Sequence, residues 1–214
     1  MSDTAPLARS PGPSARCSLL EKEGRMPALE TARLSVTPFT PALVEAALTG
    51  RTCLGRALGV CVPDDWLQDE GEGEEILPVI AEILRADMAN RASEHWGWWL
   101  ILHRADRTLI GEVTCREPRD GTGTVEIGYG VVPAYQGQGY ATEAAGAVVD
   151  GALRRPGVAR VVACCLRDNA ASRRVLEKLG LRQVGTDGAL LAWERRRRGG
   201  DPASRVTSPK PDRG

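Results

Sequence analysis

Apolar residues recur between positions 28 and 195 with two different periods, and these periods divide the stretch into strands and helices. Alternating or β-branched apolar runs predict strands at 33–38, 96–103, 108–116, 124–132, 158–166, 181–185 and 189–193. Helical spacing and capping residues predict helices at 40–49, 76–90, 139–153 and 169–179. An antiparallel meander followed by strand–helix–strand crossovers is typical of a mixed domain, so the expected fold class is α/β (α+β).

The two ends of the chain lack this periodicity. Residues 1–27 are rich in Pro, Ser, Ala and Arg and are expected to form a disordered leader to a domain at 28–195. Residues 196–214 are expected to form a basic disordered tail, with the arginine run 195–198 marking its solvated start. No apolar stretch is long enough to cross a bilayer, and no charged start precedes an apolar region, so a cytoplasmic protein without a membrane partner is expected.

Charge and cysteine content argue against several classes of partner. The 214 residues hold 28 basic and 28 acidic side chains, and this balance argues against a polyanion such as nucleic acid. The six cysteines form no C-x-x-C pair, and the chain has only two histidines. We therefore expect no metal site, and we expect the thiols to be reduced, several of them in the core.

The strand expected at 124–132 carries the first candidate for chemistry. Strict alternation places Glu126, Gly128, Gly130 and Val132 on one face of this strand. Two glycines inside a strand weaken it unless something approaches the backbone closely. The glycines are therefore expected to leave an open floor beside the Glu126 carboxylate.

A glycine-rich loop at 136–141 leads from this strand directly into a helix. Gly137 and Gly139 would let the backbone turn and expose its N–H groups, which at a helix N-terminus bind phosphate oxygens without a lysine. A Walker A loop is excluded because no lysine follows a glycine, and a dinucleotide fingerprint fits poorly because the expected third glycine is Thr142. The loop is therefore interpreted as a pyrophosphate cradle.

Two motifs together resemble the GCN5-related N-acetyltransferases (GNAT), in particular the branch of ribosomal-protein-alanine N-acetyltransferases. Gln136, Gly139 and Ala141 match the acetyl-CoA signature Gln/Arg-x-x-Gly-x-Gly/Ala, and the segment 169–181 resembles the family's N-x-x-S-x-x-V-x-x-K-x-G-F pattern. The segment 29–34 also resembles the family's usual opening. One departure is Leu181 in place of phenylalanine, which is expected to affect packing alone.

The resemblance implies a mostly antiparallel sheet with flanking helices, in which the parallel strands 124–132 and 158–166 splay apart around the pantetheine arm of acetyl-CoA. It assigns contacts with this co-substrate to the following residues: Val131 and Val132 by their backbone, Gln136, Gly137, Gln138, Gly139, Tyr140 and Ala141 at the pyrophosphate, and Asn169 and Ser172 near the thiol. No metal is implied.

The implied reaction is direct attack of a primary amine on the thioester. Glu126 is the candidate base that takes the amine proton, and Ser172 is the candidate donor to the leaving thiolate, ahead of Tyr140. Each residue also has a structural interpretation: Glu126 as a solvent-facing or ion-paired strand residue, Ser172 as part of a helix cap with Asn169, and Tyr140 as a packing residue.

The acceptor is left open as a protein N-terminus, a lysine or a small amine. Residues 64–94 hold ten acids and two arginines, which suits either an acceptor-side surface for a cationic amine or a solvated helix face. The resemblance fits a monomer or a homodimer. A different class of function is also considered, a non-catalytic acyl-CoA-binding sensor or interaction module that keeps the cradle and does not depend on Glu126.

Overall fold

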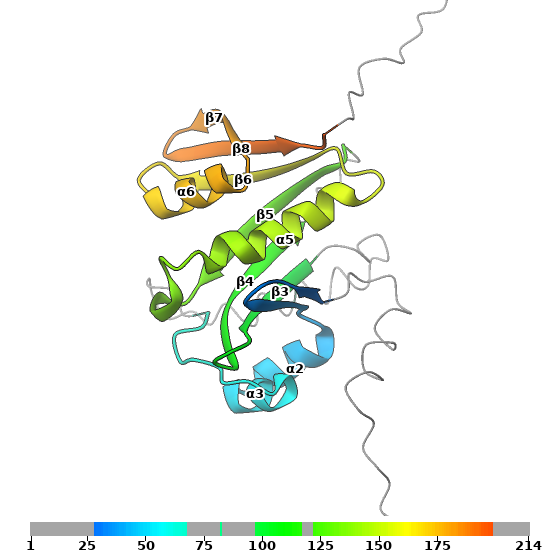
Figure 1. Cartoon of the computed structure of the whole chain (residues 1–214), viewed down its shortest axis with the longest axis vertical. Helices are drawn as coiled ribbons and strands as arrows, with labels where there is room; N and C mark the ends of the chain where they lie inside the picture. Colours follow the sequence, from blue (N-terminus) through cyan, green and yellow to red (C-terminus); the bar gives the residue numbers. More distant parts are fainter. Residues whose placement is uncertain (1–27, 68–81, 83–96, 117–121, 199–214) are drawn as a thin grey trace, which may run out of the picture.

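The computed structural model of the chain describes residues 28–67, 82, 97–116 and 122–198, and within them the centre is one eight-stranded sheet (Figure 1). The strand order is β1-β2-β3-β4-β5-β6-β8-β7. The strands are β1 (Leu29–Glu30), β2 (Leu34–Pro38), β3 (Gly97–His103), β4 (Thr108–Arg116), β5 (Thr124–Val131), β6 (Arg160–Leu166), β7 (Arg182–Asp187) and β8 (Leu190–Arg196). Neighbours are antiparallel except β5 and β6, which confirms the mostly antiparallel sheet with one parallel pair.

Four α-helices and one 3₁₀ turn accompany the sheet in the described part of the chain. They are α2 (Pro41–Thr49), α3 (Arg51–Leu58), α5 (Tyr140–Arg154) and α6 (Ala170–Lys178), with the 3₁₀ turn η3 at Pro133–Tyr135. None of these helices is long and apolar enough to cross a membrane. The helices expected at 40–49, 139–153 and 169–179 are confirmed, while the helix expected at 76–90 lies outside the described residues except at Glu82, which is helical.

Two elements differ from the sequence-based expectation. The helix α3 lies in a stretch that showed no clear helical pattern, because its eight residues include Gly55 and the poor helix formers Thr52 and Cys53. It is delimited by Gly50 and by Gly59, whose φ of 71° ends the helix in the left-handed conformation. The two-residue strand β1 was also not expected, because two residues are too few to show an alternation of apolar and polar positions.

The helix α5 crosses one face of the sheet and buries a stripe of small residues against it (Figure 1). Its buried positions are Tyr140, Ala144, Ala145, Val148, Val149, Gly151 and Ala152. They pack in one core with fully buried strand residues such as Val113, Val125 and Ile101. Alanine at the centre of this stripe lets the helix lie close to the strands, so the start of α5 is fixed beside the end of β5.

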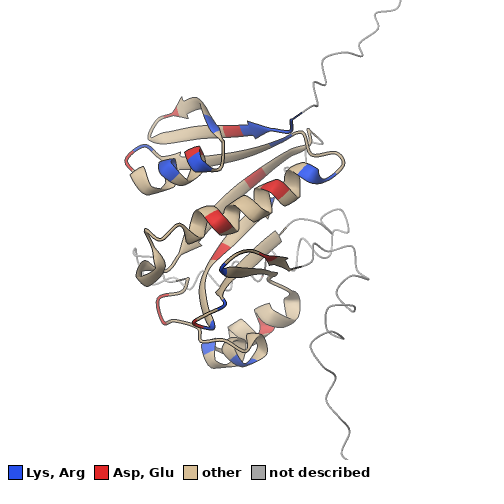
Figure 2. Cartoon of the chain, in the orientation of Figure 1, with Lys and Arg blue, Asp and Glu red and all other residues tan. Residues whose placement is uncertain are grey.

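The strand β8 extends further than expected and takes in the start of the arginine run. It continues to Arg196, and Arg195 donates to the Leu179 carbonyl (3.0 Å) and to Asp150 (2.8 Å). Arg197 donates to the Leu153 carbonyl at 2.7 Å. The run therefore does not begin as a solvated tail: alternate arginines join β8 to the ends of α5 and α6. Figure 2 shows basic positions gathered on β8 and α6.

Candidate active site

The strands β5 and β6 separate part of the way along their length. Their parallel pairing consists of Thr124↔Arg160, Val125↔Val161 and Glu126↔Val162, after which β6 continues paired with β8 alone. The remaining half of β5, from Ile127 to Val131, pairs with β4 on its other edge. The splayed pair that the resemblance implied is therefore present, and the gap opens towards the C-terminal end of β5.

Strand alternation determines which backbone groups of β5 face this gap. The carbonyl of Gly123 accepts hydrogen bonds from Ala159 and Arg160 at the start of β6, so the odd-numbered residues of β5 point towards β6. The N–H of Val131 consequently lies on the gap side. In contrast, Val132 donates to the Ile110 carbonyl and accepts from Tyr135 N–H, both at 2.9 Å. Both backbone groups of Val132 are thus already hydrogen-bonded within the protein.

The loop that follows β5 turns the chain from the strand into α5. Gln136 is extended, and its side-chain amide donates to the Val131 carbonyl at 2.9 Å. Gly137 and Gly139 have φ values of 72° and 84°, in the region that disfavours any residue with a Cβ. A Cβ at Gly137 would meet nothing within 4 Å, and one at Gly139 would lie 3.6 Å from Arg33 Nη2, so the backbone turn and not crowding requires the two glycines.

The first turn of α5 offers N–H groups at this loop. Gly139 is the N-terminal cap, it has no side chain with which to bond these groups, and its own carbonyl accepts from Glu143 N–H. The N–H groups of the first helical residues have no intrahelical acceptor by geometry. An anionic group placed above Gly139–Ala141 would therefore meet several donors and the positive end of the helix dipole. The residues present fit a pyrophosphate.

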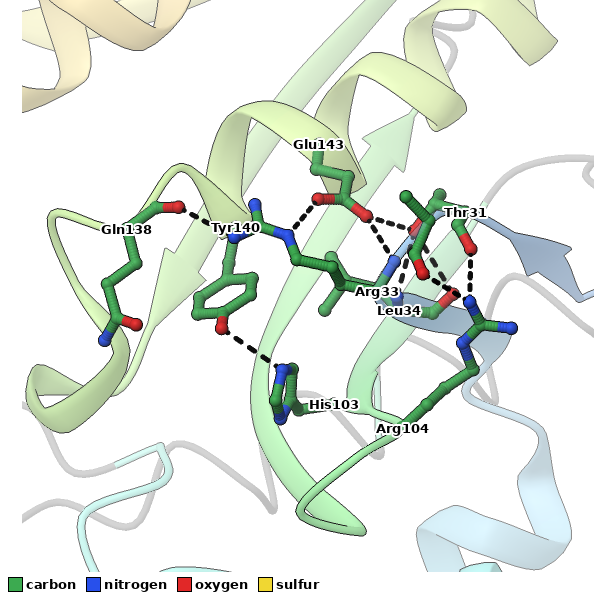
Figure 3. Close-up of polar contacts among 9 residues, drawn as sticks. Thr31, Arg33, Leu34, His103, Arg104, Gln138, Tyr140 and Glu143 are labelled. Atoms are coloured by element: carbon green, nitrogen blue, oxygen red, sulfur yellow. Dashed lines mark hydrogen bonds and ion pairs between the residues drawn. The ribbon is translucent and has the colours of Figure 1, made fainter.

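Arg33 contacts this loop and the start of α5 through its side chain, a role that sequence reasoning missed (Figure 3). Its Nε donates to Glu143 Oε2 at 2.7 Å, and its Nη1 donates to the Gln138 carbonyl at 3.1 Å. The guanidinium carbon lies 4.1 Å from the centre of the Tyr140 ring, close enough for a cation–π contact. One side chain from the turn before β2 thus contacts the cradle, its first helical residue and the first turn of α5.

Glu143 receives further hydrogen bonds at the same point. Thr31 Oγ1 donates to Glu143 Oε1 at 2.6 Å, and Arg33 N–H donates to the same oxygen at 2.9 Å. Burial acts to raise the pKa of Glu143, but these hydrogen bonds and the Arg33 charge together hold that pKa below its usual value. Glu143 is consequently ionised at neutral pH and fixes the entry of α5 to the β1–β2 turn.

Tyr140 is a packing residue, as one of the two sequence interpretations held. Its side chain is buried, and its hydroxyl lies 3.1 Å from His103 Nε2. His103 Nδ1 lies 3.0 Å from Asp106 Oδ2, and Tyr135 donates to that same oxygen at 2.8 Å. This polar chain connects the β3–β4 turn to η3 and α5. The Tyr140 hydroxyl is thus occupied inside the protein, on the His103 side.

Asn169 and Ser172 lie at the start of α6, next to β6. Asn169 is the helix cap, and its Oδ1 accepts from the Ser172 N–H at 2.9 Å. The Ser172 carbonyl accepts from the hydroxyl of Tyr129, on β5, at 3.1 Å. Burial is the main reason that the pKa of Tyr129 is raised, to about 12, so this hydroxyl stays protonated as a donor. The Tyr129 hydroxyl therefore connects β5 to α6 across the gap and holds Ser172 beside the gap.

Glu126 lies at the last paired position of β5, where the gap begins. Its side chain is exposed, and no ion pair to it exists among the residues that the structure describes. Burial and then the Glu126 charge raise the pKa of the neighbouring Cys164. The structure therefore leaves the Glu126 carboxylate available to a substrate that reaches this point.

The floor beside Glu126 is not open as expected. A Cβ at Gly128 would lie 2.8 Å from Thr114 Oγ1, and a Cβ at Gly130 would collide with Glu112 Oε1. Both side chains come from β4, where Thr114 pairs with Gly128 and Glu112 with Gly130. The two glycines make room for these cross-strand neighbours, which cover the floor.

Glu112 is the second site residue that sequence reasoning missed. Its Oε2 accepts from the Trp66 indole N–H at 3.1 Å, and burial raises its pKa despite this hydrogen bond. It lies on the same face of the sheet as Glu126, because its partner Gly130 is four positions further along β5. A single acidic residue in the middle of the apolar strand 108–116 was the signal that could have identified it.

Comparisons with known proteins agree with this arrangement. Residues 62–182 match the acetyltransferase (GNAT) domain. The chain is 30% identical over 152 residues to the uncharacterized N-acetyltransferase YjdG of Bacillus subtilis, an alignment that covers 71% of this chain and 88% of that protein.

Solved structures share the fold at lower identity. The ribosomal-protein-S5-alanine acetyltransferase of Vibrio fischeri superposes with a TM-score of 0.60 at 16% identity and covers 82% of this chain and 99% of its own. RimL, a ribosomal L7/L12 alpha-N-protein acetyltransferase in complex with coenzyme A, superposes with a TM-score of 0.55 at 16% identity, over 78% of this chain and 95% of its own. The chain belongs to the GNAT acetyltransferase family and is an acetyl-CoA-dependent N-acetyltransferase.

Proposed function

We propose that the gap between β5 and β6 and the cradle at 136–141 bind acetyl-CoA, and that the enzyme transfers its acetyl group to a primary amine by direct attack. The observation that carries the proposal is the separation of β5 from β6, at the end where β5 leads through η3 into the glycine loop and the N-terminus of α5. Backbone N–H groups of Gly137 to Ala141 would bind the pyrophosphate, while Gln136 stiffens the loop. Acetyl-CoA supplies the acetyl thioester when bound.

The pantetheine arm would pair with the edge of β5 that β6 leaves uncovered. Val131 N–H lies on that edge, whereas both backbone groups of Val132 are hydrogen-bonded elsewhere. Val132 is buried, and its side chain would form part of the wall. Asn169 and Ser172, across the gap, would contact the thiol end of the arm, with Ser172 held in place by Tyr129.

Two side chains of the protein, Glu126 and Ser172, would accept and donate the protons that the reaction moves. The attacking nitrogen must be neutral, and deprotonating an amine of pKa near 10.4 at pH 7 costs about 4.6 kcal/mol, against about 1 kcal/mol for an α-amine near 7.8. Glu126 would accept this proton directly or through a water molecule as the N–C bond forms. Ser172 would donate a hydrogen bond or proton to the sulfur as the C–S bond breaks.

The acceptor is a primary amine, and a protein N-terminus is one candidate among lysines and small amines. Support for a protein N-terminus comes from the fold neighbours named for acetylating ribosomal proteins, although at 16% identity they share only the fold. The chain's sequence relative YjdG carries no stated acceptor in its name.

Calorimetric titration of the full chain with acetyl-CoA, with NAD and ATP as comparison ligands, tests the cradle. We expect micromolar affinity for acetyl-CoA alone, abolished in Gly139→Glu, because the new side chain strains a left-handed position and places a carboxylate where the phosphate would lie. The matched control is Gly188→Glu, at another left-handed glycine in the β7–β8 turn. Equal affinity in wild type and Gly139→Glu would contradict the proposed binding site.

Turnover is then measured by release of free thiol from acetyl-CoA in the presence of primary amines. Glu126→Gln is expected to reduce kcat by about 10² or more near neutral pH while acetyl-CoA affinity is retained, since the side chain lies outside the cradle. Unchanged turnover in this variant would remove Glu126 from the mechanism and leave the binding proposal standing. Tight acetyl-CoA binding without turnover of any amine would favour a sensor instead.

A further inference from the structure

Glu112 differs from the other two half-buried acids of the described residues in how its charge is compensated. Three acids in the described residues are neither exposed nor fully buried: Glu112, Glu143 and Glu194. Glu143 is paired with Arg33, and Glu194 with Arg160 and Arg196, at 2.6–2.8 Å. Glu112 has no basic partner in the described part of the chain and receives a single neutral hydrogen bond from Trp66.

This contrast calls for a physical reason, because a carboxylate withdrawn from water is costly unless a cation or several donors compensate it. Arginines compensate the other two carboxylates, so among the residues that the structure places, Glu112 is the half-buried acid that lacks one. The Trp66 indole fixes one carboxylate oxygen, and the second is directed at Gly130, where no side chain could fit beside it. The carboxyl group is thus held at a defined point with no cation beside it among the described residues.

The position of Glu112 connects it to the proposed reaction. Its partner Gly130 belongs to the half of β5 that has separated from β6, next to Val131 on the gap edge. Glu126 lies on the same face of β5, four residues back, which is about 13 Å along a strand. The face shared by the two carboxylates is the one against which Trp66 packs, while the other face carries Tyr129, whose hydroxyl reaches α6.

We infer that Glu112 is a specificity-determining residue that binds a positively charged nitrogen of the acceptor, so that the preferred acceptor carries a second cationic group several bonds from the amine that is acetylated. The inference rests on the proposed function, in which Glu126 takes the proton of the attacking nitrogen. Two carboxyl groups on one face of the sheet, on the neighbouring strands β4 and β5, suit a flexible molecule with two amines. The shared chemistry is a primary amine with a second cation, found in a polyamine or in a peptide with a basic residue near its attacking amine.

Matched pairs of amines test this inference and separate the two sources. One pair is spermidine and butylamine, and the other is two tetrapeptides with a free α-amine that differ only in lysine or leucine at the second position. Wild type is expected to show kcat/KM about tenfold higher for the doubly charged member of at least one pair, the size of a charge-assisted hydrogen bond. In Glu112→Gln this ratio is expected to fall close to one, mainly through KM, because the amide keeps the Trp66 hydrogen bond and loses the charge.

Controls distinguish specificity from structure and from failure of the parent proposal. Asp187→Asn removes an exposed acid in β7 and is expected to keep the wild-type ratio. A wild-type enzyme that acetylates both members of each pair equally, or a Glu112→Gln variant that slows both members by the same factor, would overturn the inference and leave acetyl transfer intact.

A binding measurement covers the case in which none of these amines is acetylated. Spermidine is titrated calorimetrically into the wild-type enzyme with coenzyme A and into the Glu112→Gln enzyme under the same conditions. Binding that is at least tenfold weaker in the variant supports the inference whether or not turnover occurs. Absence of both spermidine binding and a preference within either pair overturns it, whereas loss of acetyl-CoA binding in wild type would instead contradict the proposed function.

Discussion

Arg33 and Glu143, 110 residues apart in sequence, form a two-point contact: Arg33 donates from its backbone N–H to one carboxylate oxygen and from its Nε to the other, at 2.9 and 2.7 Å. The contact ties the first turn of α5 to the edge of the sheet. The same guanidinium also donates to the Gln138 carbonyl inside the cradle. The conformation of the loop is therefore stabilised by Arg33, a residue that lies outside the acetyl-CoA motif.

Removing Arg33 is expected to weaken acetyl-CoA binding more than it alters the chemistry. Arg33→Ala loses a charge-assisted hydrogen bond to Glu143 and the bond to the Gln138 carbonyl, so the loop N–H groups lose their fixed arrangement. We expect the Kd for acetyl-CoA, measured by calorimetry, to rise about tenfold. Arg182→Ala, at an exposed position of β7, is the control, and an Arg33→Ala enzyme with the wild-type Kd would contradict this account.

How far the sequence predicted this site depends on how local each signal is. The glycines at 137 and 139, directly before a helix, indicated the cradle, and Gln136, Gly139 and Ala141 within six positions carried the family resemblance. The Arg33–Glu143 contact has no local pattern, because its partners meet only when α5 folds across the sheet. Sequence periodicity places residues on faces of single elements and does not show which residues of distant elements meet.

The same limit applied to β4 and β5. Alternation correctly placed Glu126, Gly128 and Gly130 on one face, but the register that sets Glu112 opposite Gly130 could not be read from either strand alone. The expected open floor was wrong for this reason. The arginine run is a similar case, since four identical charged residues indicate a solvated tail until their pairing with β6 and α5 is known.

Asn169 and Ser172 are expected to separate a structural role from a functional one. Asn169 accepts the Ser172 N–H as the cap of α6, so Asn169→Ala should lower the free energy of unfolding by about 1 kcal/mol in urea titrations. Ser172→Ala keeps that backbone bond and should leave stability within about 0.5 kcal/mol of wild type.

Ser172→Ala should affect turnover more than it affects stability. If its hydroxyl assists the leaving sulfur, Ser172→Ala reduces kcat by roughly tenfold or more while the Kd for coenzyme A is retained. Ser172→Thr, which keeps a hydroxyl, is expected to recover part of the activity. An alanine variant with full turnover would reduce Ser172 to a structural position at the start of α6.

Arg195 is expected to contribute to stability although it begins a run that looks like a tail. Arg195→Ala removes hydrogen bonds to the Leu179 carbonyl and to Asp150, which together join β8 to the helices. We expect thermal denaturation to give a loss of about 1 kcal/mol. Arg198→Ala, at the exposed last position of the run, should change stability by less than about 0.5 kcal/mol, and equal effects of the two substitutions would contradict the structural role.

Glu112 and Glu143 should change stability with pH in opposite directions, because burial raises the pKa of the first and hydrogen bonds to Thr31 and Arg33 lower that of the second. Glu143, with its pKa lowered in the folded state, stabilises the protein above its unfolded pKa of about 4.5, and this contribution is lost as pH falls through the folded pKa. Glu143→Gln should therefore be less stable than wild type at pH 7, with the difference narrowing in acid.

For Glu112 the change of stability with pH has the opposite sign. Its folded pKa is above the unfolded value, so the folded state retains the proton longer and stability decreases as pH rises from about 4.5 through the folded pKa. Glu112→Gln lacks this titration and keeps an acceptor for the Trp66 indole, so it should gain stability relative to wild type as pH rises. Urea titrations of both variants between pH 4 and 8 provide the measurement. A Glu112→Gln difference that is flat across this range would mean that the carboxylate is already compensated, which would remove the reason for it to bind a cationic acceptor.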